Sequence, residues 1–92
     1  ESQANVAVDL SGRPVYVQNG KFTTDRIGEF PTEMIFHFFQ SLSQSLRAAI
    51  HVEFRGENNH HMCEAIFKGV GRALQPALLR SGSELPSTKG LL

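Results

Sequence analysis

Residue types that bind metals and move protons gather in the run His60-His61-Met62-Cys63-Glu64. If this run is helical, His60 and Glu64 are four residues apart and lie one turn apart on the same face. Lys68 continues that line by another turn. The mean direction of these polar side chains is then roughly 140° from the apolar stripe of the helix. The spacing therefore predicts a polar group that faces away from the core, where a ligand can reach it.

Imidazole nitrogen and carboxylate oxygen are ligands that suit manganese, iron or zinc. Cys63 is the only cysteine and falls on the apolar stripe, so we expect inert packing rather than a thiolate-rich structural zinc site. Three ligands from one helical turn do not fill an octahedral shell, so an ion here requires donors from elsewhere. A simpler alternative is also open: adjacent histidines on an exposed face are often only solvated, and the same holds for His37 and His51.

The composition argues against several classes of function. Nine basic and nine acidic residues cancel, which leaves no charge excess of the kind that binds nucleic acid or an anionic membrane. No apolar run has the length of a transmembrane helix. A single cysteine cannot form an internal disulfide and is typical of a reducing compartment. With 92 residues, the chain is expected to form one small domain over 1–92.

Two strands, a helix, a third strand and a second helix are expected to position the cluster. Residues 4–10 and 15–18 read as strands, whereas 26–29, within the less clear stretch 21–30, is either a short edge strand or a loop. Residues 49–54 alternate as a third strand, with Ile50, Val52 and Phe54 facing inward and His51 outward. This order predicts an α+β fold, a small and mostly antiparallel sheet with two helices packed on one face.

The first helix is predicted over 34–46, with Thr32 as its cap and His37 off its apolar face. That face comprises Met34, Ile35, Phe38, Phe39, Leu42 and Leu46. The second helix is predicted from about 59 to about 79, and Pro76 is expected to kink it or end it early. Its buried stripe is predicted as Cys63, Ile66, Phe67, Val70, Ala73, Leu74 and Ala77.

Four motifs follow one another in a distinctive order and spacing. They are VDLSGRP (8–14), PTEMIFHFF (31–39), GEN-x-HH-xx-E-A-x-F-K (56–68) and PSTKG (86–90). Together they resemble the C-terminal half of imidazoleglycerol-phosphate dehydratase, from about Ala4 to Leu92. The resemblance implies that 1–92 is the C-terminal half-repeat of a duplicated unit, of the ferredoxin-like or ribosomal S5 domain 2-like type.

The resemblance also implies roles for individual residues. His60, His61 and Glu64 match metal ligands, and His37 matches a histidine that joins them from the other helix. Two manganese ions (Mn²⁺) are then expected in each complete active site, with Glu64 and His61 as the candidate catalytic groups. The positions that match substrate phosphate ligands are Arg13, Lys68, Ser87 and Lys89. His51 matches a family histidine too, but no ligand role is carried over to it.

The implied activity is that of a lyase, a carbon–oxygen hydro-lyase of histidine biosynthesis. It dehydrates D-erythro-imidazole-glycerol phosphate to imidazole-acetol phosphate, and the ion acts as Lewis acid and template. The implied partners are this small phosphate substrate, the N-terminal half of the same enzyme or its separate chain, and a homo-oligomer that is a 24-subunit shell in the family. We expect no nucleic acid or membrane partner, and a cytoplasmic location, or a plastid one in a plant.

The motif that the family carries in its N-terminal half does not occur in this sequence, so the chain has half of the ligands and is expected to be inactive alone. Because the chain starts at Glu1 rather than Met, we expect a processed chain or a fragment. One alternative function is a catalytically silent, metal-binding assembly half-domain. Another is a ferredoxin-like nucleic-acid-binding module, but the neutral charge and the single tyrosine, Tyr16, argue against it.

Overall fold

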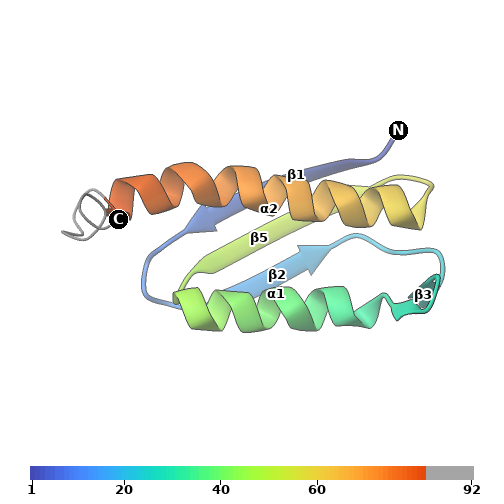
Figure 1. The fold of residues 1–92 in the computed structure, drawn as a ribbon, viewed down its shortest axis with the longest axis horizontal. Helices are drawn as coiled ribbons and strands as arrows, with labels where there is room; N and C mark the ends of the chain where they lie inside the picture. The colour runs from blue at the N-terminus through green and yellow to red at the C-terminus, as the bar shows by residue number, and fades with distance from the viewer. Residues whose placement is uncertain (83–92) are drawn as a thin grey trace.

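The structure is a computed structural model that describes residues 1–82, a three-stranded sheet with two helices on one face (Figure 1). The strands are β1 (Gln3–Asp9), β2 (Val15–Asn19) and β5 (Ala49–Arg55), in the order β1-β5-β2. Strand β1 runs antiparallel to β5, whereas β2 runs parallel to it, so the sheet is mixed. The predicted α+β class, with both helices on one face, is confirmed.

The central strand β5 divides its side chains between a covered and an open face. Ile50, Val52 and Phe54 are buried under the helices, as predicted, while His51 and the other alternate residues are exposed on the opposite face. This alternation follows from the two-residue period of a strand. The helices therefore cover one face of the described sheet, and the open face carries polar side chains such as His51 and Glu53 beside the exposed Val15.

A small hairpin separates β2 from the first helix. It consists of β3 (Arg26–Ile27) and β4 (Phe30–Pro31), which pair with each other and not with the main sheet. Gly28 in its turn has a φ of 62°, a left-handed conformation that glycine adopts without steric cost. The sequence left a short edge strand or a loop open for residues 26–29, whereas the structure shows two short strands that pair with each other, so neither lies at the edge of the main sheet.

Helix α1 (Glu33–Leu46) begins directly after Thr32, but the Thr32 hydroxyl does not cap it. The hydroxyl donates instead to the carbonyl oxygen of Thr24, at 3.2 Å. Thr32 therefore occupies the capping position, as predicted, but its side chain forms no capping hydrogen bond, because it is turned toward the loop that precedes the helix.

The apolar face of α1 is wider than the surface it shares with the sheet. Ile35 and Phe39 are buried, but Met34 and Phe38 keep 45% and 50% of their surface exposed. Phe36, on the other flank, packs against the ring of Tyr16 with centroids 5.3 Å apart. Part of the predicted apolar face is thus left on the surface of the described chain.

Helix α2 (Asn59–Gly82) packs on β1 and β5 along a line rotated from the predicted stripe. Phe67, predicted to be buried, is 41% exposed, and Met62, which was not on the stripe, is fully buried. The helix comes very close to β1, since a Cβ added to Gly69 would lie 2.7 Å from Cγ2 of Val6. This close approach fixes which side of α2 faces the sheet.

Helix α2 continues through Pro76 to Gly82, so the predicted early end at this proline is wrong. A proline inside a helix removes one main-chain hydrogen bond. Ala77, the next residue, is only 5% exposed. Within residues 1–82 neither helix is long and apolar enough to cross a membrane.

Candidate metal centre

The start of α2 is fixed by an asparagine that the sequence analysis did not single out. The side-chain oxygen of Asn58 accepts a hydrogen bond from the backbone N–H of His61 at 2.9 Å. Its carbonyl oxygen accepts the first helical bond, from the N–H of Met62 at 2.9 Å. This is the arrangement of a capping residue, and it could have been inferred from an asparagine directly before a helical run. It places both histidines of the cluster in the first turn.

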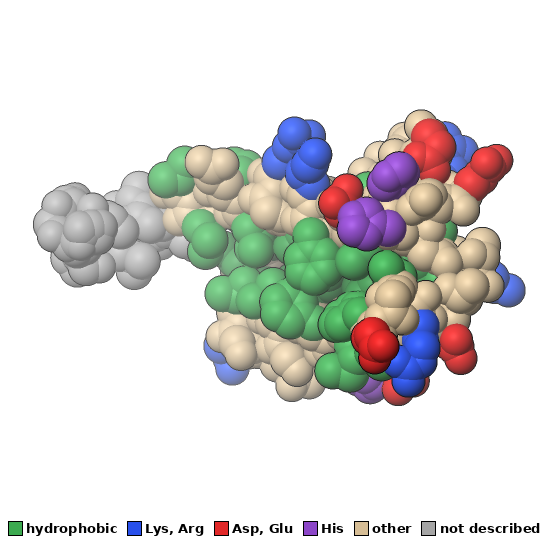
Figure 2. Space-filling model, turned by 45° about the vertical axis from the view of Figure 1, so that its right-hand side comes forward, with side chains coloured by type: hydrophobic (Ala, Val, Ile, Leu, Met, Phe, Trp, Pro, Cys, Tyr) green, Lys and Arg blue, Asp and Glu red, His purple; other side chains and the backbone are tan. Residues whose placement is uncertain are grey.

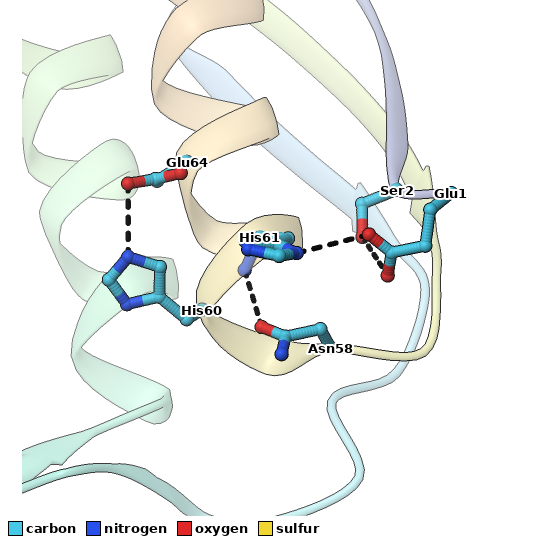
Figure 3. A network of polar contacts seen from close by, with 6 residues as sticks. All are labelled: Glu1, Ser2, Asn58, His60, His61 and Glu64. Carbon is cyan, nitrogen blue, oxygen red and sulfur yellow. Dashed lines mark hydrogen bonds and ion pairs between the residues drawn. The ribbon is translucent and has the colours of Figure 1, made fainter.

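His60 and Glu64 form a pair on one face of α2, as the spacing predicted (Figure 3). The His60 Nε2 and Glu64 Oε2 atoms are 3.0 Å apart, and both side chains are more than half exposed. Donor atoms bound about 2.1 Å from an ion at a right angle to each other lie about 3 Å apart. The observed pair therefore has the separation that two ligands of one ion require.

His61 points to the other side of the helix (Figure 3). Its Nδ1 atom is 3.0 Å from Oε1 of Glu1, and its ring lies at 77° to the ring of His60, with centroids 5.9 Å apart. Hydrogen bonds from His61 and from the hydroxyl of Ser2 lower the pKa of the Glu1 carboxyl group below its usual value. The two adjacent histidines thus have separate carboxylate partners in this chain.

Lys68 shares an open groove with His61 and Glu64, between α2 and the first residues of the chain. The groove is also lined by Glu1 and by Arg72, which the sequence analysis did not include. Within residues 1–82 neither Lys68 nor Arg72 forms an ion pair. Two unpaired cations therefore lie next to the proposed ligands, where an anionic group of a substrate can meet them.

The other predicted site residues are not assembled with this cluster. His37 is exposed in the second turn of α1, with its ring edge against Phe36 at a centroid distance of 5.8 Å. Arg13 lies in the loop from β1 to β2, at the end of the sheet away from the start of α2 (Figure 1). Ser87 and Lys89 lie outside the described residues. In the part of the chain that the structure describes, no three His, Cys, Asp or Glu side chains are placed to hold one ion.

Cys63 is not a candidate nucleophile. Burial raises the pKa of its thiol, and the negative charge of Glu64 acts in the same direction. A thiol with a raised pKa carries little thiolate near neutral pH and reacts slowly. The cysteine therefore contributes packing beside the site, as its position on the helix indicated.

A sequence model of the family described as "Imidazoleglycerol-phosphate dehydratase" matches residues 1–74. The whole chain is similar to proteins named "Histidine biosynthesis bifunctional protein HisB". The one from Legionella pneumophila (strain Philadelphia 1) is 55% identical over 92 residues, and the one from Stenotrophomonas maltophilia (strain K279a) is 49% identical over the same length. The chain spans 26% of each of these relatives.

One solved structure also resembles the chain, the crystal structure of imidazoleglycerol-phosphate dehydratase from Staphylococcus aureus. The superposition has a TM-score of 0.77 with 41% sequence identity. It covers 80% of this chain and 44% of the other. The chain is therefore similar in sequence and in fold to less than half of that protein.

Proposed function

The chain belongs to the imidazoleglycerol-phosphate dehydratase family, and we propose that it supplies half of a manganese-dependent dehydratase site. The reaction is the removal of water from D-erythro-imidazole-glycerol phosphate to give imidazole-acetol phosphate, in histidine biosynthesis. The observation that carries this proposal is the exposed His60–Glu64 pair, whose donor atoms are 3.0 Å apart at the start of α2.

In this proposal the chain's histidines serve two manganese ions. His60 and Glu64 hold one ion, and His37 of α1 joins them when the site is assembled. His61 holds the second, because its Nδ1 atom is directed to Glu1 and away from the His60–Glu64 pair. When bound, manganese supplies a Lewis acid, which stabilises the negative charge that develops as the carbon–oxygen bond breaks.

The remaining side chains bind and orient the substrate and move its protons. Glu64 and His61 are the groups within reach of the reacting end, as acid and base. Lys68 follows Glu64 by one turn, about 6 Å along the helix axis, so imidazole and phosphate ends of one small molecule fit along the shared groove. Arg13, Ser87 and Lys89 are the further phosphate ligands that we propose on the family motif, from this or a neighbouring chain.

An exposed apolar surface on the helices supports the proposal that this half binds a partner. Figure 2 shows hydrophobic side chains gathered beside the purple histidines, on the helix layer. Its exposed members include Met34, Phe38 and Phe67, each at least 41% exposed. A surface of this kind usually marks an interaction site. We propose that the N-terminal half, in the same or another chain, and the 24-subunit shell of the family complete the site, in the cytoplasm.

A second candidate is a catalytically silent half-domain that binds metal and assists assembly, and the exposed apolar side chains of the helices are the observation that favours it. Assaying dehydration after this chain is combined with the other half and manganese separates the two. We expect turnover only when all three are present. A correctly assembled complex that binds manganese and yet forms no product would contradict the enzyme proposal and leave the second candidate.

A further inference from the structure

Asn59, the first residue of α2, is bonded to a loop that comes from a distant part of the sequence. Its side-chain oxygen accepts a hydrogen bond from the backbone N–H of Thr23 at 2.8 Å. Its side-chain nitrogen donates to the hydroxyl groups of Thr23 and Thr24, both at 2.8 Å. A single amide therefore makes three contacts across 35 and 36 residues of sequence.

The same loop is bonded in turn to the start of α1. The carbonyl oxygen of Thr24 accepts from the Thr32 hydroxyl at 3.2 Å, and that of Asp25 accepts from the Thr32 N–H at 2.9 Å. Thr32 immediately precedes α1 and is buried, and its carbonyl oxygen accepts from the N–H of Ile35. Hydrogen bonds thus run without interruption from the first residue of α2 to the first turn of α1.

This chain of bonds links the two helices that carry the proposed manganese ligands. Asn59 directly precedes His60, and Thr32 lies five residues before His37. The helices lie side by side with their starts at the same end of the molecule (Figure 1). About two turns further along α2, Phe67 contacts Phe38 and Phe39 of α1, with centroids 5.5 and 4.8 Å apart. The helix pair is therefore fixed both beside the ligands and beyond them.

We infer that Asn59 is a positioning residue, which sets the placement of His60 and Glu64 relative to His37 through the loop at 23–25. The inference rests on the proposed function. The two neighbouring asparagines have different roles. Asn58 caps α2 by accepting from the N–H of His61, and Asn59 bonds α2 to the loop that leads into α1. Only an amide of this length offers both an acceptor for an N–H and donors for two hydroxyl groups. The Thr24 hydroxyl donates its hydrogen to the carbonyl oxygen of Arg26. Its oxygen can therefore only accept a hydrogen bond from Asn59.

The first test needs no metal and uses hydrogen exchange of the Thr23 amide. In the native protein we expect this amide to be protected by Asn59. Asn59→Ala removes the acceptor and should remove the protection, whereas Asn59→Asp keeps an acceptor and should retain most of it. Exchange at Thr23 that is equally fast in the native protein and in Asn59→Ala would overturn the inference at its structural basis.

The second test measures manganese affinity in the complex assembled with the other half, from the electron paramagnetic resonance signal of free Mn²⁺. Residues that orient metal ligands typically contribute about 10-fold to 100-fold in affinity. We expect Asn59→Ala to weaken binding about tenfold, with Asn59→Asp in between. Ile50→Val, in the core and away from the loop, is the control for general destabilisation, and its affinity should stay native.

The outcomes separate this inference from the proposed function. If the native complex binds no manganese, both the proposed function and the positioning role of Asn59 are overturned. Native binding together with native affinity in Asn59→Ala overturns the positioning role alone. Equal loss of affinity in Asn59→Ala and in Ile50→Val, at matched unfolding temperature, also overturns it, because the effect is then one of stability. Loss in Asn59→Ala alone, with partial recovery in Asn59→Asp, is the result that the inference predicts.

Discussion

The two sides of the first turns of α2 are built differently. On the side toward α1, His60 pairs with Glu64 within the same helix, and Phe67 continues that side onto the rings of α1. On the side toward β1, His61 pairs with Glu1, sixty residues earlier, and shares a groove with Lys68. The first side holds a pair of candidate metal donors formed by helical spacing alone. The second combines one candidate donor with cations, and depends on how the helix lies against β1.

Under the proposed function, one short motif serves two kinds of ligand. Adjacent residues on a helix point about 100° apart, so His60 and His61 cannot easily serve the same ion from one turn. We interpret the α1 side as a place for a metal and the β1 side as a place where a second ion and the phosphate end of the substrate come together. Changes on the two sides should then have different effects.

The largest effect is expected from Glu64→Gln, on the α1 side. The amide keeps the size of the side chain but removes the charge that a divalent ion requires, so manganese affinity in the assembled complex should fall about 100-fold. Elemental analysis after dialysis measures the manganese retained. Glu53→Gln, on the open face of the sheet, is the matched control and should retain native content. Full occupancy in Glu64→Gln would remove Glu64 from the ligand set.

The next largest effect is expected where α2 touches β1. Gly69→Ala introduces a methyl group 2.7 Å from Val6, and overpacking of this kind costs about 1–3 kcal/mol in the free energy of unfolding. Gly71→Ala is the matched control, because a Cβ there meets nothing within 4 Å and alanine favours the helix by about 0.5–1 kcal/mol. Thermal unfolding should therefore move in opposite directions. A stabilised Gly69→Ala protein would mean that α2 does not lie against β1 in this way.

A smaller effect is expected from Lys68→Ala, on the β1 side. Hydrogen bonds to charged groups contribute about 1.5–3 kcal/mol, so the KM for the phosphate substrate should rise about tenfold or more in the assembled enzyme. Manganese content should not change, since Lys68 is not a metal ligand. Steady-state kinetics and elemental analysis on the same sample check both statements. Loss of manganese with an unchanged KM would reverse the roles that we give to the two sides.

The smallest effect concerns Cys63, which lies between the two sides. Because burial and Glu64 raise its thiol pKa, less thiolate is present at pH 8 than in an ordinary exposed cysteine. Alkylation by iodoacetamide should therefore be several-fold slower than that of glutathione, and should speed up as the pH rises past the usual thiol range. Reaction at the glutathione rate would show that the helix opens readily at this point.

The sequence predicted the features that depend on local spacing. The His60–Glu64 pair, the alternation along β5 and the two helices all follow from fixed periods of the backbone. Features set by tertiary contact were missed or wrong. Thr32 bonds to Thr24 instead of its own helix, and the close approach of α2 to β1 at Gly69 turns Met62 inward and leaves Phe67 exposed. Helix α2 continues through Pro76, which the residue type alone argues against.

The candidate site shows the same division. Helical spacing placed His60, Glu64 and Lys68 on the surface, but it could not show that His61 turns to Glu1. The hydrogen bonds of Asn59 could not be predicted from the sequence, since its partners lie 35 and 36 residues away. The roles of His37 and Arg13 stay predictions, because within residues 1–82 neither side chain lies in a group of potential ligands with the cluster.

The central claim is that His60 and Glu64 hold manganese, and electron spin-echo modulation of bound Mn²⁺ tests it most directly. In the assembled complex the ion should show coupling to imidazole nitrogen, which changes when histidine is labelled with ¹⁵N. His60→Gln should reduce that coupling, whereas His51→Gln, on the open face of the sheet, should leave it intact. Bound manganese whose nitrogen coupling is the same in His60→Gln and in the native complex would contradict the account.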